Sequence, residues 1–127
     1  MKIVHREYAF EDNRGQILDI LENEAIDSVT LINSKKGAIR GDHYHKETTQ
    51  YVFILNGELE LLTQAGEDAL EKAILKKGDL AVTGPMEKHA MKALQDSEFL
   101  VLTRGPRGGK NYENDTYKLK NSLYKNL

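Results

Sequence analysis

The sequence predicts an all-β chain whose antiparallel strands form a sandwich or a barrel, and three observations support this. Short runs of apolar and β-branched residues recur at a spacing of roughly 8–12 residues. Turn signals such as Asn56-Gly57 and Gly84-Pro85 separate these runs. The length of 127 residues suits one domain and is too short for two full domains or a TIM barrel.

Five runs carry the strand pattern most clearly: 28–33, 50–55, 58–63, 80–83 and 98–103. The run 50–55 is the strongest, because five of its six residues are aromatic or branched aliphatic. Asn56-Gly57 directly after it predicts a hairpin with the next run, since a tight two-residue turn needs positive φ at both positions. Residues 69–75 give a less clear pattern and are compatible with a helical turn.

Composition excludes several classes of function. Hydrophobic residues make up 39% and charged residues 30%, as in a globular chain, and no apolar run approaches the ~20 residues needed to cross a bilayer. The first residues contain no apolar core of signal-peptide length, so we expect a cytoplasmic protein. The absence of cysteine excludes disulfides and thiolate sites. The net charge of −2 gives no reason to expect nucleic acid or an acidic membrane as a partner.

The charge of the chain is uneven at one end. Residues 104–127 carry six Lys or Arg against two acidic residues. This part of the chain is also rich in Asn, Gly and Tyr. We therefore expect a barrel over residues 1–104 and a basic C-terminal extension, 105–127, that packs on the barrel or is partly disordered.

Two of the four histidines form the pattern His43-Tyr44-His45. Side chains two apart on a strand point to the same face, so these two imidazoles would converge on one point inside a barrel. That arrangement provides the first two ligands of a metal site, and equally a paired acid and base. His5 lies near the N-terminus, away from this pattern, and is expected to be exposed.

The surroundings of the pair fit a longer pattern, G-x5-H-x-H-x4-Q-x6-G, formed by Gly37, His43, His45, Gln50 and Gly57. A second block runs from Gly78 to His89. The two blocks resemble the two motifs of the cupin superfamily, with Gln50 where glutamate is usual. In the second block only the first glycine and His89 fall at the usual positions. The resemblance implies a single-domain antiparallel cupin β-barrel, or jelly roll.

A narrower resemblance lies in the string from Arg40 to Lys46, taken together with Gln50. It is similar to the R-G-x-H-x-H-K-x3-Q stretch of nucleotide-sugar 3,4-ketoisomerases, which are RmlC-like cupins. The Arg-Gly-x-His-Tyr core of this string also resembles the related 3,5-epimerases. Both families carry an Asp-x-Arg-Gly element near the N-terminus, which here is Asp12 to Gly15. The resemblance implies a nucleotide-linked deoxy-keto-sugar as the small-molecule substrate, a role in surface polysaccharide synthesis, and a homodimer. It also implies that His43 and His45 are the catalytic bases and that Arg14 and Arg40 hold the substrate.

A first hypothesis is an isomerase or epimerase that needs no metal. One neutral imidazole removes the proton next to the ketone, and the second imidazole, or Tyr44 or Tyr51, returns a proton to the neighbouring carbon or the enediol oxygen. Histidine suits this role because its reference pKa of ~6.5 makes both protonation states available near neutrality. Gln50 would hydrogen-bond a sugar oxygen or fix a histidine tautomer, and Tyr51 would contact the sugar.

Two alternatives use the same residues. In the first, His43, His45, Gln50 and His89 bind one divalent metal (Zn, Mn, Fe or Ni), as in a metal-binding cupin such as a dioxygenase. In the second, the barrel binds a sugar without catalysis. Whether the chain is an enzyme therefore stays open between these readings, with sugar isomerisation favoured.

Overall fold

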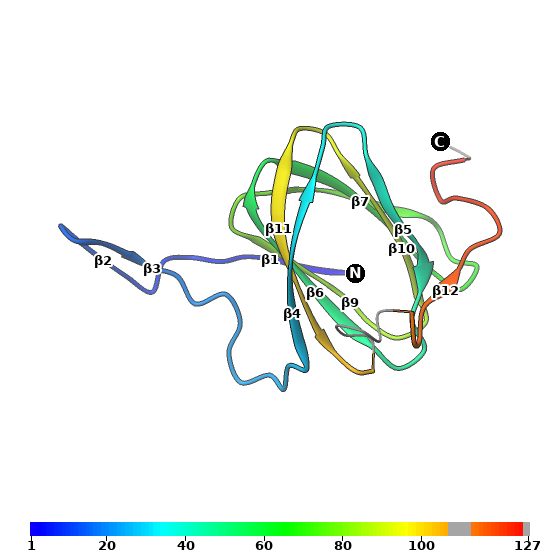
Figure 1. Ribbon diagram of the computed structural model, residues 1–127, viewed down its shortest axis with the longest axis horizontal. Helices are drawn as coiled ribbons and strands as arrows, with labels where there is room; N and C mark the ends of the chain where they lie inside the picture. The colour runs from blue at the N-terminus through cyan, green and yellow to red at the C-terminus, as the bar shows by residue number, and fades with distance from the viewer. Residues whose placement is uncertain (107–112, 126–127) are drawn as a thin grey trace.

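The computed structural model describes residues 1–106 and 113–125. All helical or extended elements in these residues are β-strands. Most of them lie in two antiparallel five-stranded sheets that face each other (Figure 1). The all-β fold class and the jelly-roll architecture are thereby confirmed. The described residues contain no helix that is both long and apolar enough to cross a membrane.

The first sheet has the strand order β1-β9-β6-β11-β4, with the bounds β1 Lys2–His5, β9 Asp79–Thr83, β6 Thr49–Asn56, β11 Ser97–Arg104 and β4 Ser28–Ser34. The second sheet has the order β12-β5-β10-β7-β8, with the bounds β12 Tyr117–Lys118, β5 Ile39–Tyr44, β10 Glu87–Ala93, β7 Glu58–Ala65 and β8 Glu71–Lys76. A separate hairpin, β2 (Phe10–Asp12) with β3 (Gly15–Ile17), projects from the barrel (Figure 1).

The main core lies between the two sheets, because strand alternation brings one apolar face of each sheet inward. Its largest buried members include Ile54, Leu59, Leu61, Leu75 and Phe99, each at most 1% exposed. The outer faces are covered by the two ends of the chain. Leu18, Ile20, Leu21 and Ile26 pack on the first sheet, and Leu119, Leu123 and Tyr124 pack on the second.

The turn at Asn56-Gly57 does not close a hairpin, and the prediction made for it is wrong. β6 pairs with β9 and β11, whereas β7 pairs with β8 and β10, so this turn carries the chain from one sheet to the other. Gly57 has φ +90°, and a Cβ there would lie 2.3 Å from the Ser97 hydroxyl. Glycine is therefore required because the corner packs against the turn between β10 and β11, rather than because two strands pair beside it.

Four of the five predicted runs match β4, β6, β7 and β11 within two residues at each end, and the fifth matches β9. Residues 69–75, compatible with a helical turn, instead contain most of β8, which pairs along β7 and buries Leu75. Residues 113–125 of the C-terminal extension lie along the second sheet (Figure 1). The rest of the extension beyond residue 106 lies outside the described residues.

Candidate active site

The inner face of the barrel changes from apolar to polar at one level across several strands. On β6 the inward residues run from Ile54 and Val52 to Gln50, and on β11 from Phe99 and Val101 to Thr103. The strand register places Gln50 beside Thr103 and Thr83 in the first sheet. In the second sheet it places His89 beside His43 and Thr63. One end of the interior is therefore lined by imidazole, amide and hydroxyl groups.

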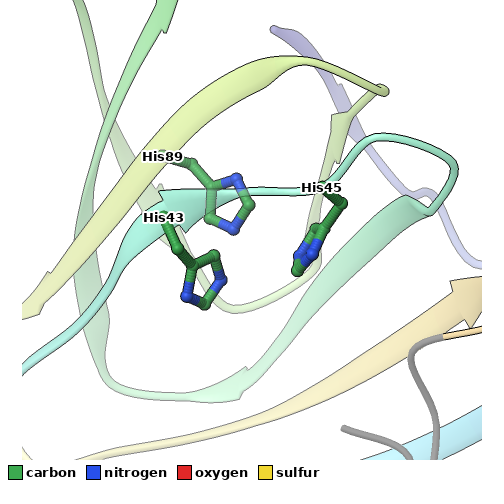
Figure 2. A group of neighbouring side chains, drawn as sticks. All are labelled: His43, His45 and His89. Atoms are coloured by element: carbon green, nitrogen blue, oxygen red, sulfur yellow. The ribbon is translucent and has the colours of Figure 1, made fainter. Parts of the chain in front are cut away.

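Three histidines meet at this polar end. His43 comes from β5, His45 follows that strand directly, and His89 comes from β10 (Figure 2). The ring centroids are 4.8 Å apart for His43–His45, 4.6 Å for His43–His89 and 5.2 Å for His45–His89. His45 and His89 are each 1% exposed, whereas His43 is half-buried. The convergence that the His-x-His spacing predicts is thus present, and His89 completes a triangle.

A bulge in β5 turns His43 toward the interior. The register shifts between His89 and Ala90, so that His43 pairs with His89 and Gly41 pairs with Ala90, while Asp42 has no partner on β10. Gly41 and Asp42 both have positive φ, +89° and +57°. A Cβ at Gly41 would lie 3.0 Å from the His89 carbonyl oxygen, so glycine permits the close approach of the two strands.

Backbone carbonyls hold both buried imidazoles by the same ring nitrogen. His45 Nδ1 lies 2.9 Å from the Asp115 carbonyl oxygen, and His89 Nδ1 lies 3.2 Å from that of Glu87. A carbonyl oxygen only accepts hydrogen bonds, so each Nδ1 donates its proton. In the neutral rings Nε2 then carries the lone pair. Each buried ring can therefore offer this atom as a base or as a metal ligand.

Two threonines at the same level escaped the sequence analysis. The hydroxyls of Thr63 and Thr83 are buried, and neither has a hydrogen-bond partner among the described residues. Their positions follow from alternation, since each lies two residues beyond an inward-facing apolar residue, Leu61 or Ala81. A buried hydroxyl without a partner is costly, so these groups are suited to meet water or a polar ligand.

Neither tyrosine expected at the site faces the histidines. Tyr44 lies between His43 and His45 on the chain, so alternation turns its ring outward, where it stacks on Tyr117 at 5.4 Å. Tyr51 follows the inward-facing Gln50 and lies on the outer face of the first sheet, in a cluster with Leu80 and Leu102. Both rings therefore lie on the outer faces of the sheets, away from the histidine triangle.

The two arginines expected to hold the substrate also lie apart from the histidine triangle. Arg14 sits in the projecting hairpin with its side chain 82% exposed and paired to Asp12 at 2.8 Å. The Arg40 guanidinium donates to the Ser34 hydroxyl at 2.7 Å and to the Asn33 carbonyl at 3.0 Å, both on β4. Arg40 lines a pocket of about 670 Å³ together with those two residues and six others, none of them a histidine.

A jelly roll with a His-x-His pair and a third histidine on its inner face defines this protein as a small cupin. Its sequence matches a model of the polysaccharide biosynthesis C-terminal domain over residues 10–117, and the chain belongs to that family. No curated protein sequence matches the chain.

Several solved structures resemble the chain over most of its length. A 3,4-ketoisomerase from Helicobacter canadensis is 25% identical, with a TM-score of 0.79 over 93% of this chain and 90% of that one. A sugar 3,4-ketoisomerase from Thermoanaerobacterium thermosaccharolyticum, solved with TDP, is 21% identical, with a TM-score of 0.78 over 94% and 88%. The dTDP-4-dehydrorhamnose 3,5-epimerase from Sulfolobus tokodaii is 19% identical, with a TM-score of 0.68 over 80% and 76%. The resemblance to ketoisomerase and epimerase cupins is confirmed, and the last two similarities concern the fold alone.

Proposed function

We propose that this chain is an isomerase or epimerase of a nucleotide-linked deoxy-keto-sugar. The observation that carries the proposal is the triangle of His43, His45 and His89 at the polar end of an otherwise apolar barrel. Such a site can remove a carbon-bound proton beside a ketone and return a proton to the same or the neighbouring carbon. The ketoisomerase and epimerase names of similar structures support this reaction class.

The proton transfer divides between two imidazoles. His45 is buried and donates through Nδ1, so its Nε2 is the base that removes the proton next to the ketone. The electron pair of the broken C–H bond forms the enediolate, and the proton of the hydroxyl on that carbon passes to the former ketone oxygen. His43, half-buried beside it, returns a proton to the neighbouring carbon and completes the isomerisation. Gln50 and the buried threonine hydroxyls are placed to hydrogen-bond the sugar oxygens.

Arg40 is proposed to hold the anionic diphosphate. It lies three residues before His43, which is roughly 10 Å along an extended strand. A diphosphate attached to a sugar ring at the histidines would lie at a similar distance from the reacting carbons. Its guanidinium is held by β4, so it is ordered before substrate binds.

We also propose that the protein works as a cytoplasmic homodimer in which the projecting hairpin contacts a second copy. Phe10 and Ile17, which are paired in that hairpin, are 50% and 56% exposed. Two large apolar side chains on a projecting element are costly to leave in water. Arg14, in the same hairpin, would then act at a substrate only through the partner. Light scattering of the purified protein tests the dimer.

The reaction is tested with TDP-4-keto-6-deoxyglucose, the sugar bound by one of the similar ketoisomerases. In D₂O, proton removal and return by imidazole incorporates deuterium at the carbon that is protonated, which proton NMR and mass spectrometry detect. We expect deuterium uptake and a new keto-sugar. Binding of the sugar with neither deuterium uptake nor isomerisation, across a panel of TDP- and UDP-linked keto-sugars, would favour the sugar-binding alternative.

A metal-binding cupin remains the second candidate, because the same histidines form a suitable donor set. One ligand atom from each of the three residues lies within 4.8 Å of the others. Tetrahedral zinc with Zn–N bonds of 2.0–2.1 Å needs nitrogens about 3.3 Å apart, so small side-chain movements would close the site. When bound, a divalent ion would polarise a substrate oxygen, and Gln50 would add an amide oxygen. About one metal per chain by elemental analysis, lost in His89→Ala together with activity, would favour this candidate.

A further inference from the structure

The C-terminal segment, residues 113–125, returns to the strand that carries the site histidines. Its short strand β12 pairs with the edge of β5, with Tyr117 opposite Tyr44 and Lys118 opposite His43. The Lys46 ammonium lies 4.4 Å from the centre of the Tyr117 ring, a cation–π contact on the same edge. The segment thus lies directly beside the part of the chain from which the histidine side chains project.

Asp115 binds the turn that follows His45. Its carboxylate accepts hydrogen bonds from three consecutive backbone N–H groups, those of Lys46 at 2.8 Å, Glu47 at 2.9 Å and Thr48 at 2.9 Å. The Thr48 hydroxyl adds a fourth at 2.8 Å. Burial alone would raise the pKa of this carboxyl, but the four donors hold its pKa below the ordinary value. The carboxylate therefore fixes the backbone of the turn in one conformation.

The same residue holds the His45 ring. The Asp115 carbonyl oxygen accepts from His45 Nδ1 at 2.9 Å. Asp115 has φ +70°, a left-handed conformation that presents its carbonyl to the ring while its carboxylate binds the turn. Through two groups, one residue thus constrains both the backbone next to His45 and the orientation of its imidazole.

We propose that Asp115 is the positioning residue of His45, selecting the tautomer in which Nδ1 carries the proton and Nε2 faces the reacting carbon. This proposal rests on the proposed function of the histidine triangle. A second anchor of the segment is independent of Asp115, because Asp42 accepts from Ser122 Oγ at 2.7 Å and from the Leu123 backbone N–H at 2.9 Å. Substitutions at Asp115 therefore leave that attachment in place.

Two substitutions separate the role of the backbone conformation at residue 115 from the role of the hydrogen bonds that its side chain accepts. Asp115→Gly tolerates the positive φ but removes all four side-chain hydrogen bonds. Asp115→Asn also tolerates that φ and keeps one acceptor oxygen, enough for the three bonds that a single carboxylate oxygen now accepts from Glu47 and Thr48. Glu113→Gly, which deletes an exposed acidic side chain two residues away, is the matched control.

In the deuterium-uptake assay we expect Asp115→Gly to lower kcat about 10- to 100-fold with KM changed less than about threefold, since orienting partners of site histidines have effects of this size. Asp115→Asn should recover most of the loss, and Glu113→Gly should match the unmodified chain. Nitrogen-15 NMR of the His45 ring should show one tautomer in the unmodified chain and in Asp115→Asn, and a mixture in Asp115→Gly.

An unchanged His45 tautomer in Asp115→Gly, or a kcat within about twofold of the unmodified chain, would overturn the proposal. Amide exchange at Leu123, whose N–H binds Asp42, reports whether the segment is still attached in each variant. If Asp115→Gly detaches the C-terminal segment, the decision passes to Asp115→Asn. The proposal then stands only if that variant keeps the segment attached and keeps the single tautomer of His45. If the unmodified chain turns over no keto-sugar, the proposed function fails, while the NMR measurement still decides whether Asp115 positions His45.

Discussion

The two halves of the barrel interior use the same strands for opposite purposes. Toward the corner at Gly57, the inward residues are apolar, tightly packed and almost fully buried, with Ile54, Leu59 and Phe99 at most 1% exposed. Toward the other end, the same strands turn histidines and threonines inward, and two of these buried hydroxyls have no hydrogen-bond partner among the described residues. The contrast indicates that the apolar half supplies stability, whereas the polar half presents buried groups that could bind a ligand.

The strongest test of the polar half is a substitution of His45, the proposed base. His45→Asn keeps a polar side chain of smaller size but cannot accept a proton, so we expect kcat/KM to fall by about 10²- to 10⁴-fold, the usual contribution of general acid–base catalysis. Keto-sugar turnover followed by NMR gives the value, and the circular dichroism spectrum should be retained. The matched control is His5→Asn, on the exposed β1 strand, which should turn over sugar at the unmodified rate. A fall of less than threefold in His45→Asn would remove the assignment of the base.

The apolar half is tested by Phe99→Ala. Phe99 is fully buried between the sheets, so the substitution leaves a cavity and should reduce the free energy of unfolding by about 3–5 kcal/mol. Urea denaturation measures the difference. Val29→Ala on the neighbouring strand β4, where the side chain is 62% exposed, should change stability by no more than about 0.5 kcal/mol. Equal effects of the two substitutions would contradict the location of the core.

A pair of isosteric substitutions distinguishes a threonine whose hydroxyl stabilises the fold from one whose hydroxyl is available to a ligand. Thr48→Val deletes the hydroxyl that binds the Asp115 carboxylate and should cost about 1.5–3 kcal/mol of stability. Thr83→Val deletes a buried hydroxyl with no partner among the described residues, and should leave stability unchanged or raise it by about 1 kcal/mol. Thermal unfolding measures both. A large loss in Thr83→Val would mean that its hydroxyl is bound by a group other than a ligand.

The smallest expected effect concerns His5, a histidine outside the interior. The hydrogen bond that His5 Nδ1 donates to the Asp79 carboxylate, at 2.7 Å, raises the pKa of His5 above its ordinary value. A raised folded-state pKa gives stability that is complete below about pH 6.5 and is lost as the pH rises through the folded-state pKa. The midpoint of thermal unfolding should therefore fall slightly more between pH 6 and pH 8 in the unmodified chain than in His5→Gln. If the midpoint of thermal unfolding changes equally with pH in the unmodified chain and in His5→Gln, the contact between His5 and Asp79 contributes no stability.

The motif predicted which histidines meet better than it predicted the residues that surround them. Spacing brought His43 and His45 to one end of the interior, because residues two apart share a face of a strand. The resemblance to the cupin motif added Gln50. The same rule argues against Tyr44 and Tyr51, each adjacent to an inward-facing residue, and it locates Thr63 and Thr83 from the apolar residues beside them. Alternation applied along every strand would have corrected the tyrosines and found the threonines.

Contacts between distant parts of the chain could not be predicted in this way. The strand pattern around Asn56-Gly57 is that of a hairpin, and only the packing of Gly57 against Ser97 shows that the chain crosses between sheets there. The bulge at Asp42 depends on which strand lies beside β5. The contact between His45 and Asp115 joins residues 70 apart, and nothing in the local pattern of either residue points to the other.

That last contact also sets the order in which the protein can become functional during its synthesis. His43 and His45 leave the ribosome before the residue that holds the His45 ring, which is made 70 residues after His45. Until then the nascent chain carries its histidines on a strand whose edge is not yet covered by β12. The contact can form only after residue 115 has emerged, so translation that stops before it would leave the His45 ring without this hydrogen bond.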